Sequence, residues 1–160
     1  MLSRSRNSPD RRPTQRETVS INVTGLEVFD TTVRKTNTWL HDLMEELGWS
    51  DRHKAYLALR ATLHALRDRL TVDEVAHLGA QLPMLIRGFY YEGWVPSHTP
   101  LKVRRRDQFL ALIERQFSDD EIDTDLVARG VLAVLSRRIA DGEIEDVRRV
   151  LPAEIRELMS

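Results

Sequence analysis

The side chains best suited to metal chemistry are histidines and glutamates in the first half of the chain. His41 stands four residues before Glu45, and Glu74 stands three residues before His77. Both spacings bring two side chains together on one helix face. Di-iron helical bundles use the element Glu-x-x-His, but they need two copies of it. The position equivalent to His77 later in the chain is Asp146, so the sequence predicts no metal site and no cofactor.

A second group of candidate metal ligands is the acidic run DDEIDTD at residues 119–125. A calcium-binding EF-hand loop requires a glycine at its sixth position and a glutamate at its twelfth, and no frame through this run supplies both. The run precedes an apolar helix predicted to begin near Leu126. Carboxylates at a helix N-terminus interact favourably with its dipole, so the run is interpreted as a capping segment.

Two arginines, Arg60 and Arg129, lie beside the apolar stripes of two predicted helices. Glu74 and Glu143 open the helices that follow. Because the same pair of charges occurs in both halves, we expect an ion pair between the second and third helix of each half. The alternative is a pair of anion-binding sites built on Arg60 and Arg129.

The basic residues Lys102, Arg104, Arg105 and Arg106 lie near the middle of the chain. They are the best material for nucleic-acid binding, but acidic residues follow closely, and the segment matches no known DNA-reading or RNA-binding motif. The chain also lacks a Ser-His-Asp arrangement and a glycine-rich phosphate loop. The sequence therefore predicts no catalytic residues.

Four of the ten aromatic residues of the chain lie close together in the stretch QLPMLIRGFYYEGWVPSHTP at residues 81–100. Aromatic side chains bury large areas, so we expect this stretch to be wedged between the two halves of the protein. An exposed part of Tyr91 or Trp94 is the alternative, because exposed aromatic surface often contacts a partner.

The elements that carry these residues are predicted to be helices almost throughout. In one segment the residues Tyr56, Leu59, Leu63, Leu66 and Leu70 follow steps of three and four, which place them on one helix face. Expected helix ends include Gly48 as a C-cap, Ser50 or Asp51 as an N-cap, a capping box at Thr71 and Glu74, and a helix start near Pro83. No run alternates with period two, so the fold class is all-α.

The chain also resembles itself when its first half is aligned with its second half without a gap. Residues repeated in this alignment include Leu43, Asp51, Arg60, Leu63, Arg69, Glu74, Pro83, Ile86 and Arg87, which match Leu112, Asp120, Arg129, Leu132, Arg138, Glu143, Pro152, Ile155 and Arg156. The fixed spacing that takes Leu43 to Leu112 is called the repeat offset below. Such self-similarity indicates an internal repeat. We therefore expect two tandem four-helix repeats, about residues 30–93 and 100–160, packed with pseudo-symmetry.

Composition places these repeats in one domain, residues 27–160, behind a disordered basic tail at residues 1–26. Residues 1–20 contain five arginines and almost nothing apolar. The whole chain of 160 residues carries a formal net charge of -1 and no cysteine, which argues against disulfides and thiolate chemistry. Apolar runs are far shorter than the roughly 20 residues of a membrane span, and no secretory signal is present, so the expected location is the cytoplasm.

Three segments carry a family resemblance: GLEVFDTTVRKTNTWLHDLMEELGW, RHKAYLALRATLHALRDRLTVDEVAHLGAQLPMLIRGFYYEGW and RGVLAVLSRRIADGEIEDVRRVLPAEIRELM. They resemble the bacterial family named domain of unknown function 2267, over roughly Gly25 to Met159. The most specific parts are the helix HKAYLALRATLHALRDRL and the segment QLPMLIRGFYYEGW. The resemblance implies a small all-helical bacterial protein without an established activity or assigned functional residues.

The favoured interpretation is a non-enzymatic protein-interaction or regulatory module of a bacterial cell, which binds another protein or a second copy of itself. One alternative is a helical bundle that binds a small molecule or an anion. A second alternative is a nucleic-acid-associated protein that uses the arginine-rich junction. The candidate contacts are Arg60, Arg129, Tyr91, Trp94, Arg104, Arg105 and Arg106.

Overall fold

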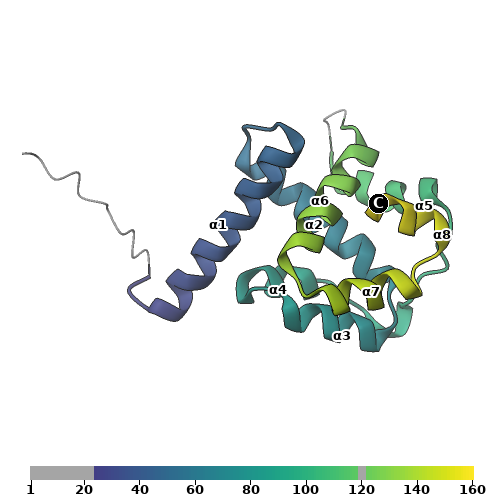
Figure 1. Cartoon of the computed structure of the whole chain (residues 1–160), viewed down its shortest axis with the longest axis horizontal. Helices are drawn as coiled ribbons and strands as arrows, with labels where there is room; N and C mark the ends of the chain where they lie inside the picture. Colours follow the sequence, from purple (N-terminus) through teal and green to yellow (C-terminus); the bar gives the residue numbers. More distant parts are fainter. Residues whose placement is uncertain (1–23, 119–121) are drawn as a thin grey trace, which may run out of the picture.

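The computed structural model describes residues 24–118 and 122–160. Within these residues the chain forms helices and turns and no strand, which confirms the all-α prediction. The elements are α1 (Glu27–Leu47), α2 (Arg52–Arg69), α3 (Val72–Gln81), α4 (Met84–Tyr91), η1 (Pro96–His98), α5 (Arg106–Glu114), α6 (Thr124–Arg138), α7 (Asp141–Val150), α8 (Ala153–Arg156) and η2 (Glu157–Met159). Figure 1 shows their arrangement.

Local chemistry sets the helix boundaries where the sequence predicts them. α1 ends at Gly48, whose left-handed backbone (φ 66°) favours glycine. Asp51 caps α2 and Thr71 caps α3, because each side-chain oxygen accepts a hydrogen bond from a backbone N–H in the first turn. Asp123 caps α6 in the same way, which confirms a capping role for this part of the acidic run. α4 begins directly after Pro83.

The start of α1 is fixed by Thr24, which lies just before the helix. Its backbone N–H and its hydroxyl both donate to Asp30 Oδ1, at 3.0 and 2.8 Å. Asp30 is buried, so these two hydrogen bonds satisfy a carboxylate that has left water. Residues 1–23, which make up most of the predicted basic tail, lie outside the described residues.

α2 and α6 pack against each other, and both α1 and α5 pack on this central pair. α4 packs against α1 and α2, while α3 contacts α7 (Figure 1). Fully buried leucines of this core include Leu43, Leu59, Leu63, Leu66, Leu132 and Leu135. Each buried leucine contributes about 1.5–3 kcal/mol relative to an exposed one, so the apolar stripes of α2 and α6 determine how the other helices pack.

The contact between α1 and α6 depends on a glycine. A Cβ atom added at Gly130 of α6 would lie 2.6 Å from Leu47 Cδ2 of α1. That separation is shorter than any van der Waals contact between two carbon atoms. The absence of a side chain at Gly130 therefore lets the C-terminal end of α1 approach α6.

The aromatic stretch holds α4 to its neighbours within the first half. Tyr90 is fully buried, and its hydroxyl donates to the Val75 carbonyl of α3 at 2.8 Å. Phe89 packs edge-on against Tyr56 of α2, with ring centroids 5.4 Å apart. These contacts differ from the expected wedge between halves, because α4 lies on α1, α2 and α3. The halves meet instead through the pairs α1 and α6, α2 and α5, α2 and α6, and α3 and α7.

Candidate interaction groove

An open groove of about 920 Å³ lies between α1, α2 and α4. Its walls are mainly apolar and include Phe29 and Leu40 of α1, Tyr56 of α2, and Leu85 and Phe89 of α4. The volume is within the range of roughly 300–1,000 Å³ that is typical of ligand pockets. Phe29 is 44% exposed and Leu85 is 45% exposed, so this surface is apolar and open to water.

Small residues line the middle of the groove. Thr32 Oγ1 accepts the backbone N–H of Leu85 at 2.9 Å, and the Thr36 hydroxyl donates to the Thr32 carbonyl at 2.7 Å. Both hydroxyl groups are thus satisfied within the chain. A Cβ atom added at Gly88 of α4 would meet no atom within 4 Å. The groove is therefore hollow between its larger aromatic and aliphatic walls.

Polar side chains stand on the rim. Arg52 Nη1 donates to the Asn37 side-chain oxygen at 3.0 Å. His53, the residue after Arg52 in α2, also lines the groove. Glu92, which follows α4, forms an ion pair with Arg60 at 3.5 Å. Arg52 forms no ion pair with any residue that the structure describes, so the rim carries an uncompensated positive charge.

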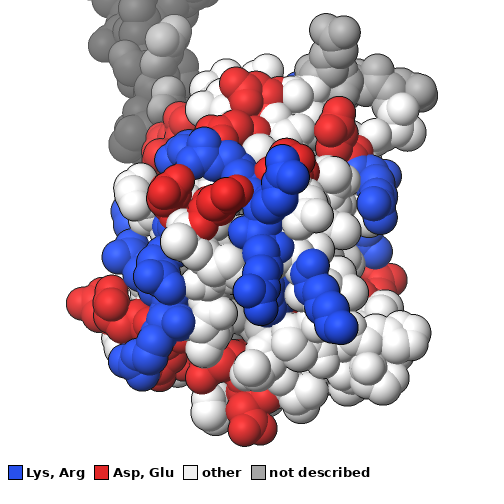
Figure 2. All heavy atoms as spheres, turned by 90° about the vertical axis from the view of Figure 1, so that its right-hand side faces the viewer, with Lys and Arg blue, Asp and Glu red and all other residues white. Residues whose placement is uncertain are grey.

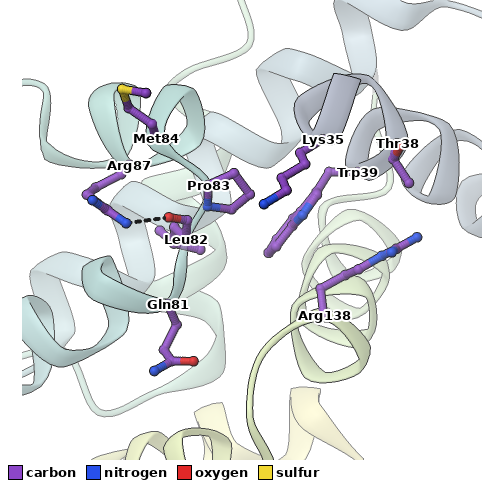
Figure 3. Close-up of a pocket in the computed structure, with 9 residues that line it drawn as sticks. All are labelled: Lys35, Thr38, Trp39, Gln81, Leu82, Pro83, Met84, Arg87 and Arg138. Atoms are coloured by element: carbon purple, nitrogen blue, oxygen red, sulfur yellow. Dashed lines mark hydrogen bonds between the residues drawn. The ribbon is translucent and has the colours of Figure 1, made fainter. Parts of the chain in front are cut away.

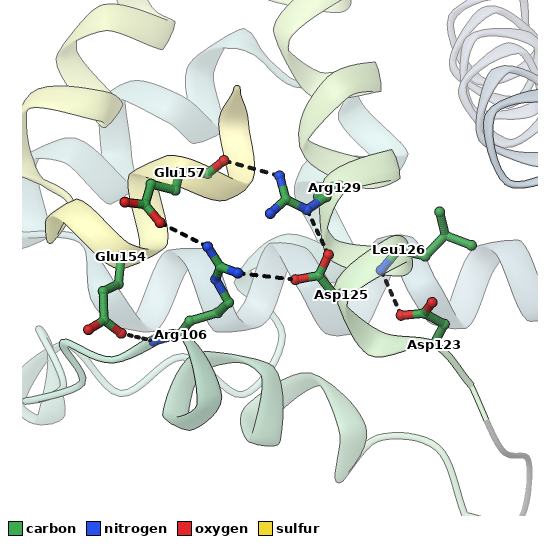
Figure 4. Close-up of polar contacts among 7 residues, drawn as sticks. All are labelled: Arg106, Asp123, Asp125, Leu126, Arg129, Glu154 and Glu157. Carbon is green, nitrogen blue, oxygen red and sulfur yellow. Dashed lines mark hydrogen bonds and ion pairs between the residues drawn. The ribbon is translucent and has the colours of Figure 1, made fainter.

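In the second half the corresponding surface is a smaller open hollow of about 610 Å³ that charged side chains line, among them Arg106, Glu154 and Glu157 (Figure 4). Under the repeat offset, Leu85 corresponds to Glu154 and Gly88 corresponds to Glu157. The Arg106 guanidinium binds the Glu157 carboxylate at 2.8 Å, and the Arg106 backbone N–H donates to Glu154 Oε2 at 2.8 Å. Charged side chains and their ionic contacts therefore line a surface that is mainly apolar in the first half.

Asp125 and Arg129 extend this network, which we call the α5–α8 ion network. Arg129 Nε donates to Asp125 Oδ1 at 2.6 Å, and Asp125 Oδ2 lies 4.0 Å from Arg106 Nη1. Arg129 also donates to the backbone carbonyl of Glu157 at 3.2 Å (Figure 4). Tyr56, a wall of the groove, corresponds to Asp125 under the repeat offset, so an aromatic wall in one half is replaced by a carboxylate in the other.

Comparison with known proteins places the chain in a family. The model of the family described as "Uncharacterized conserved protein (DUF2267)" matches residues 36–158, from within α1 to η2. The chain belongs to this family. No curated protein matches the chain. The function of the DUF2267 domain is unknown, so it has to be argued from the surfaces that the structure presents.

The ion pairs predicted between the second and third helix of each half are wrong. Arg60 pairs with Glu92, and Arg129 pairs with the aspartate one turn before it. Arg60 lies on the side of α2 that faces the C-terminal end of α4, and Arg129 lies on the side of α6 that faces the start of η2. Glu74 and Glu143 point elsewhere, toward the contact between α3 and α7. Helical spacing identified the residues but not the direction of each side chain.

Glu74 and Glu143 come close to each other where α3 meets α7. Glu74 Oε2 and Glu143 Oε1 are buried and have no hydrogen-bond partner among the described residues. Burial raises the pKa of Glu143, and the nearby charges of Glu74 and Asp146 raise it further, while His77 opposes them. The Thr71 half of the predicted capping box is present, but among the described residues no hydrogen bond joins the Glu74 carboxylate to the Thr71 backbone N–H, and its Oε2 is buried without a partner.

A second cleft, of about 490 Å³, lies between α1, the turn before α4 and the end of α6 (Figure 3). Lys35, Arg87 and Arg138 line it together with the nearly buried Trp39. Arg87 is already bonded to the backbone, including the Leu82 carbonyl at 2.8 Å, and Arg138 pairs with an aspartate of α1. Among the described residues, Lys35 is the one cation of this cleft without an ion pair or backbone partner, which is weak support for an anion site.

The basic cluster before α5 is interleaved with acidic residues. Arg105 pairs with Asp107 at 3.1 Å, and Arg106 belongs to the α5–α8 ion network, whereas Arg104 is exposed. Figure 2 shows basic and acidic side chains side by side on this face. A nucleic-acid track requires a continuous positive surface, so the arrangement gives the nucleic-acid alternative little support. In the part of the chain that is described, no helix is long and apolar enough to cross a membrane.

The two aromatic residues proposed as partner contacts lie away from the groove. Tyr91 packs against Tyr90 and Trp94, with ring centroids 4.9 and 5.7 Å away. Its hydroxyl occupies the space above Gly79, where a Cβ atom would overlap with it. Both Tyr91 and Trp94 are half-buried, so their contacts in the described chain are mainly with the core.

The sequence analysis missed Arg67, which is 4% exposed. Its guanidinium donates to the carbonyls of Tyr90 and Glu92 at 2.7 and 2.9 Å and to the Asp68 carboxylate at 2.8 Å. A helix end leaves carbonyls unpaired, and here an arginine of α2 satisfies them. The sequence feature that could have identified Arg67 as a buried residue is its position on the apolar stripe of α2, between two buried leucines.

His64 provides a second hold on α4. Its Nε2 lies 2.5 Å from the Phe89 carbonyl. Burial lowers the pKa of His64, although the hydrogen bond to Phe89 opposes that shift. The ring is therefore neutral near pH 7 and donates its Nε2–H to the carbonyl. α4, which forms one wall of the groove, is thus fixed to α2 by the buried contact of Arg67 with Tyr90 and by the half-buried contact of His64 with Phe89.

The residues that the structure describes contain no group of three or more histidine, aspartate or glutamate side chains that could hold a metal ion. His41 and Glu45 do come together at 3.0 Å, as their spacing predicts, but both are exposed on α1. Residues 119–121 of the acidic run lie outside the described residues.

Proposed function

We propose that the DUF2267 domain is a non-enzymatic protein-interaction module of the bacterial cytoplasm and that it binds a protein partner in the groove between α1, α2 and α4. One observation carries the proposal. The groove is larger and mainly apolar, whereas the corresponding surface of the second half is a smaller hollow lined by charged side chains of the α5–α8 ion network. Exposed apolar surface costs free energy in water, and on a folded protein it marks a place that another molecule covers.

The comparison between halves assumes that residues 27–160 form a single domain of two pseudo-symmetric four-helix repeats, with the basic tail outside it. Several features support this architecture. The first and last residues of α3 correspond to those of α7 under the repeat offset. Arg87 and Arg156, which are related in the same way, each donate two hydrogen bonds of 2.8 Å to the carbonyls at the end of the preceding helix. The packing of α1 on α6 also has its counterpart in the packing of α5 on α2.

The rim of the groove supports a protein partner more than an apolar small molecule. Polypeptide interfaces combine an apolar centre with a polar edge. Here the edge contains Arg52, His53 and the pair formed by Arg60 and Glu92, which surround the apolar walls. Arg60 therefore remains a partner contact in this proposal, as a rim residue. The lack of cysteine fits a reducing compartment.

The test is site-specific photocrosslinking in living cells. A photoreactive amino acid replaces Leu85 in the groove or, as the matched control, Glu154 at the corresponding position of the second half. We expect a covalent adduct with a polypeptide from position 85 and none from position 154. Equal adducts from the two positions, or none from position 85, would contradict the proposed function.

A further inference from the structure

Exposed apolar side chains, among them Phe29, Met84 and Leu85, line the groove, and further ones lie at the start of α1. Of the eight large apolar residues that are most exposed in the described chain, Leu26, Val28, Phe29, Met84 and Leu85 lie on α4 or at the start of α1. Each of them is 44–57% exposed. Figure 1 shows that the first turns of α1 project beyond the other helices. The same surface therefore contains both a projecting apolar helix and an apolar hollow.

The groove has the dimensions to accept a helix. Phe29, Thr32, Thr36 and Leu40 line its α1 side and follow one another at helical spacing. At about 1.5 Å of rise per residue they extend over roughly 16 Å, or three helical turns. The small residues in the middle, including Gly88 on the opposite wall, leave room for the side chains of an incoming helix.

Charge on the two parts is complementary. Glu27 is an exposed acidic residue in the first turn of α1, and Arg52 is an exposed basic residue on the rim of the groove. Neither forms an ion pair with a described residue, because the only hydrogen bond of the Arg52 guanidinium there is to the neutral Asn37 amide. An antiparallel α1 from a second copy, centred near Thr32, would bring its Glu27 to this rim. The reverse contact would form at the same time, because a two-fold axis makes every contact twice.

We propose that the protein forms a two-fold symmetric homodimer in which α1 of each copy lies antiparallel to α1 of the other and fills its groove. Glu27 of one copy then pairs with Arg52 of the other. The exposed apolar residues at the start of α1 and on α4 become buried in both copies. This inference rests on the proposed function, since it assigns a second copy of the chain as the partner in the same groove.

The first test is sedimentation equilibrium of the full chain and two glycine variants. Gly88→Glu places a carboxylate in the groove, as the second half does at Glu157, whereas Gly142→Glu adds the same group on exposed α7, far in sequence from the groove. An added side chain meets open space at both glycines. We expect a dimer for the wild type and for Gly142→Glu, and at least a tenfold higher dissociation constant for Gly88→Glu.

The second test reverses the proposed ion pair. Glu27→Arg alone and Arg52→Glu alone should each weaken the dimer, and the double variant should restore it, because the opposite charges meet again. A circular dichroism melt of each variant checks that the fold is retained.

Three outcomes would overturn the homodimer: a wild-type chain that stays monomeric up to about 1 mM, the weak end of specific affinity; a dimer that Gly88→Glu leaves intact; or a double variant that stays weak. A monomer that still gives an adduct with a different polypeptide from position 85 would reject the homodimer and keep the proposed function.

Discussion

Arg67 is a charged side chain that the fold buries almost completely, and its replacement should be costly. Arg67→Met leaves the Asp68 carboxylate and two carbonyls at the end of α4 without their donor. Removing one partner of a buried, hydrogen-bonded charge typically costs about 3–5 kcal/mol. Since Asp68 is partly exposed, we expect a loss near the lower end, about 3 kcal/mol, in the free energy of unfolding measured by urea denaturation.

Arg60→Met is the matched control for this prediction. Arg60 lies two turns before Arg67 on α2, and its ion pair with Glu92 is long, at 3.5 Å, and open to solvent. Exposed pairs contribute about 0–1 kcal/mol, so this variant should unfold at nearly the wild-type urea concentration. Equal losses for the two variants would show that the hydrogen bonds to the end of α4 do not carry the effect.

At the scale of helices, the approach of α1 to α6 depends on Gly130. Gly130→Ala places a methyl group against Leu47, and overpacking of this kind costs about 1–3 kcal/mol. The better helix propensity of alanine offsets about 0.5–1 kcal/mol of this cost, and the end of the Leu47 side chain can shift, so we expect a net loss of up to about 1 kcal/mol and a lower melting temperature.

Gly142→Ala provides the comparison for that variant. Gly142 lies in α7, and an added methyl group meets no atom within 4 Å there. Alanine is a better helix former than glycine by about 0.5–1 kcal/mol, so this variant should melt at a higher temperature than the wild type. A decrease for both variants would assign the effect at Gly130 to something other than the contact with Leu47.

The helix ends were predictable from the sequence, but the groove was not. Caps such as Asp51 and Thr71 act on backbone groups within the next turn, so a short window of sequence contains the whole interaction. The groove depends on where α4 lies against α1, and these helices are joined by contacts between distant positions such as Thr32 and Leu85. In the sequence, Phe29 and Leu85 follow the same apolar pattern as core residues, and only packing distinguishes an exposed position from a buried one.

The ion-pair and hydrogen-bond partners of the charged residues were also not predictable from helical spacing. Helical periodicity placed Arg60 beside an apolar stripe, but the rotation of α2 about its axis decides whether the side chain reaches α3 or the end of α4. A comparison of charged residues between the two halves does not identify Arg67 either, because its counterpart under the repeat offset is Ser136. A residue that acts in only one half leaves no trace in a comparison of the two.

At the scale of the whole molecule, the contact between α3 and α7 should make stability depend on pH. The pKa of Glu143 is raised in the folded chain, so the folded state binds more protons than the unfolded state above the ordinary glutamate pKa of about 4.3. The free energy of unfolding therefore falls as pH rises from that value through the raised pKa. Glu143→Gln should remove this loss and be more stable than the wild type at pH 7, by a few tenths of a kcal/mol up to about 1 kcal/mol.

Thermal melts between pH 4 and pH 8 check this prediction, with Glu145→Gln as the control. Glu145 lies on the same helix but is exposed, so its replacement should leave the pH profile unchanged. A profile for Glu143→Gln that is parallel to the wild type would show that the two facing carboxylates exert no net repulsion.

The pair formed by Glu74 and Glu143 also bears on how the two halves of the protein could have evolved. If the chain arose by duplication of a gene for one four-helix unit, the ancestral protein would have met its own copy across this contact, with every substitution present on both sides. Fusion into one chain ends that constraint, because each half then mutates alone. One half can then keep an apolar binding surface, while the other half gains carboxylates at the corresponding positions and no longer binds there. A domain with a single binding face can descend in this way from a symmetric ancestor that had two.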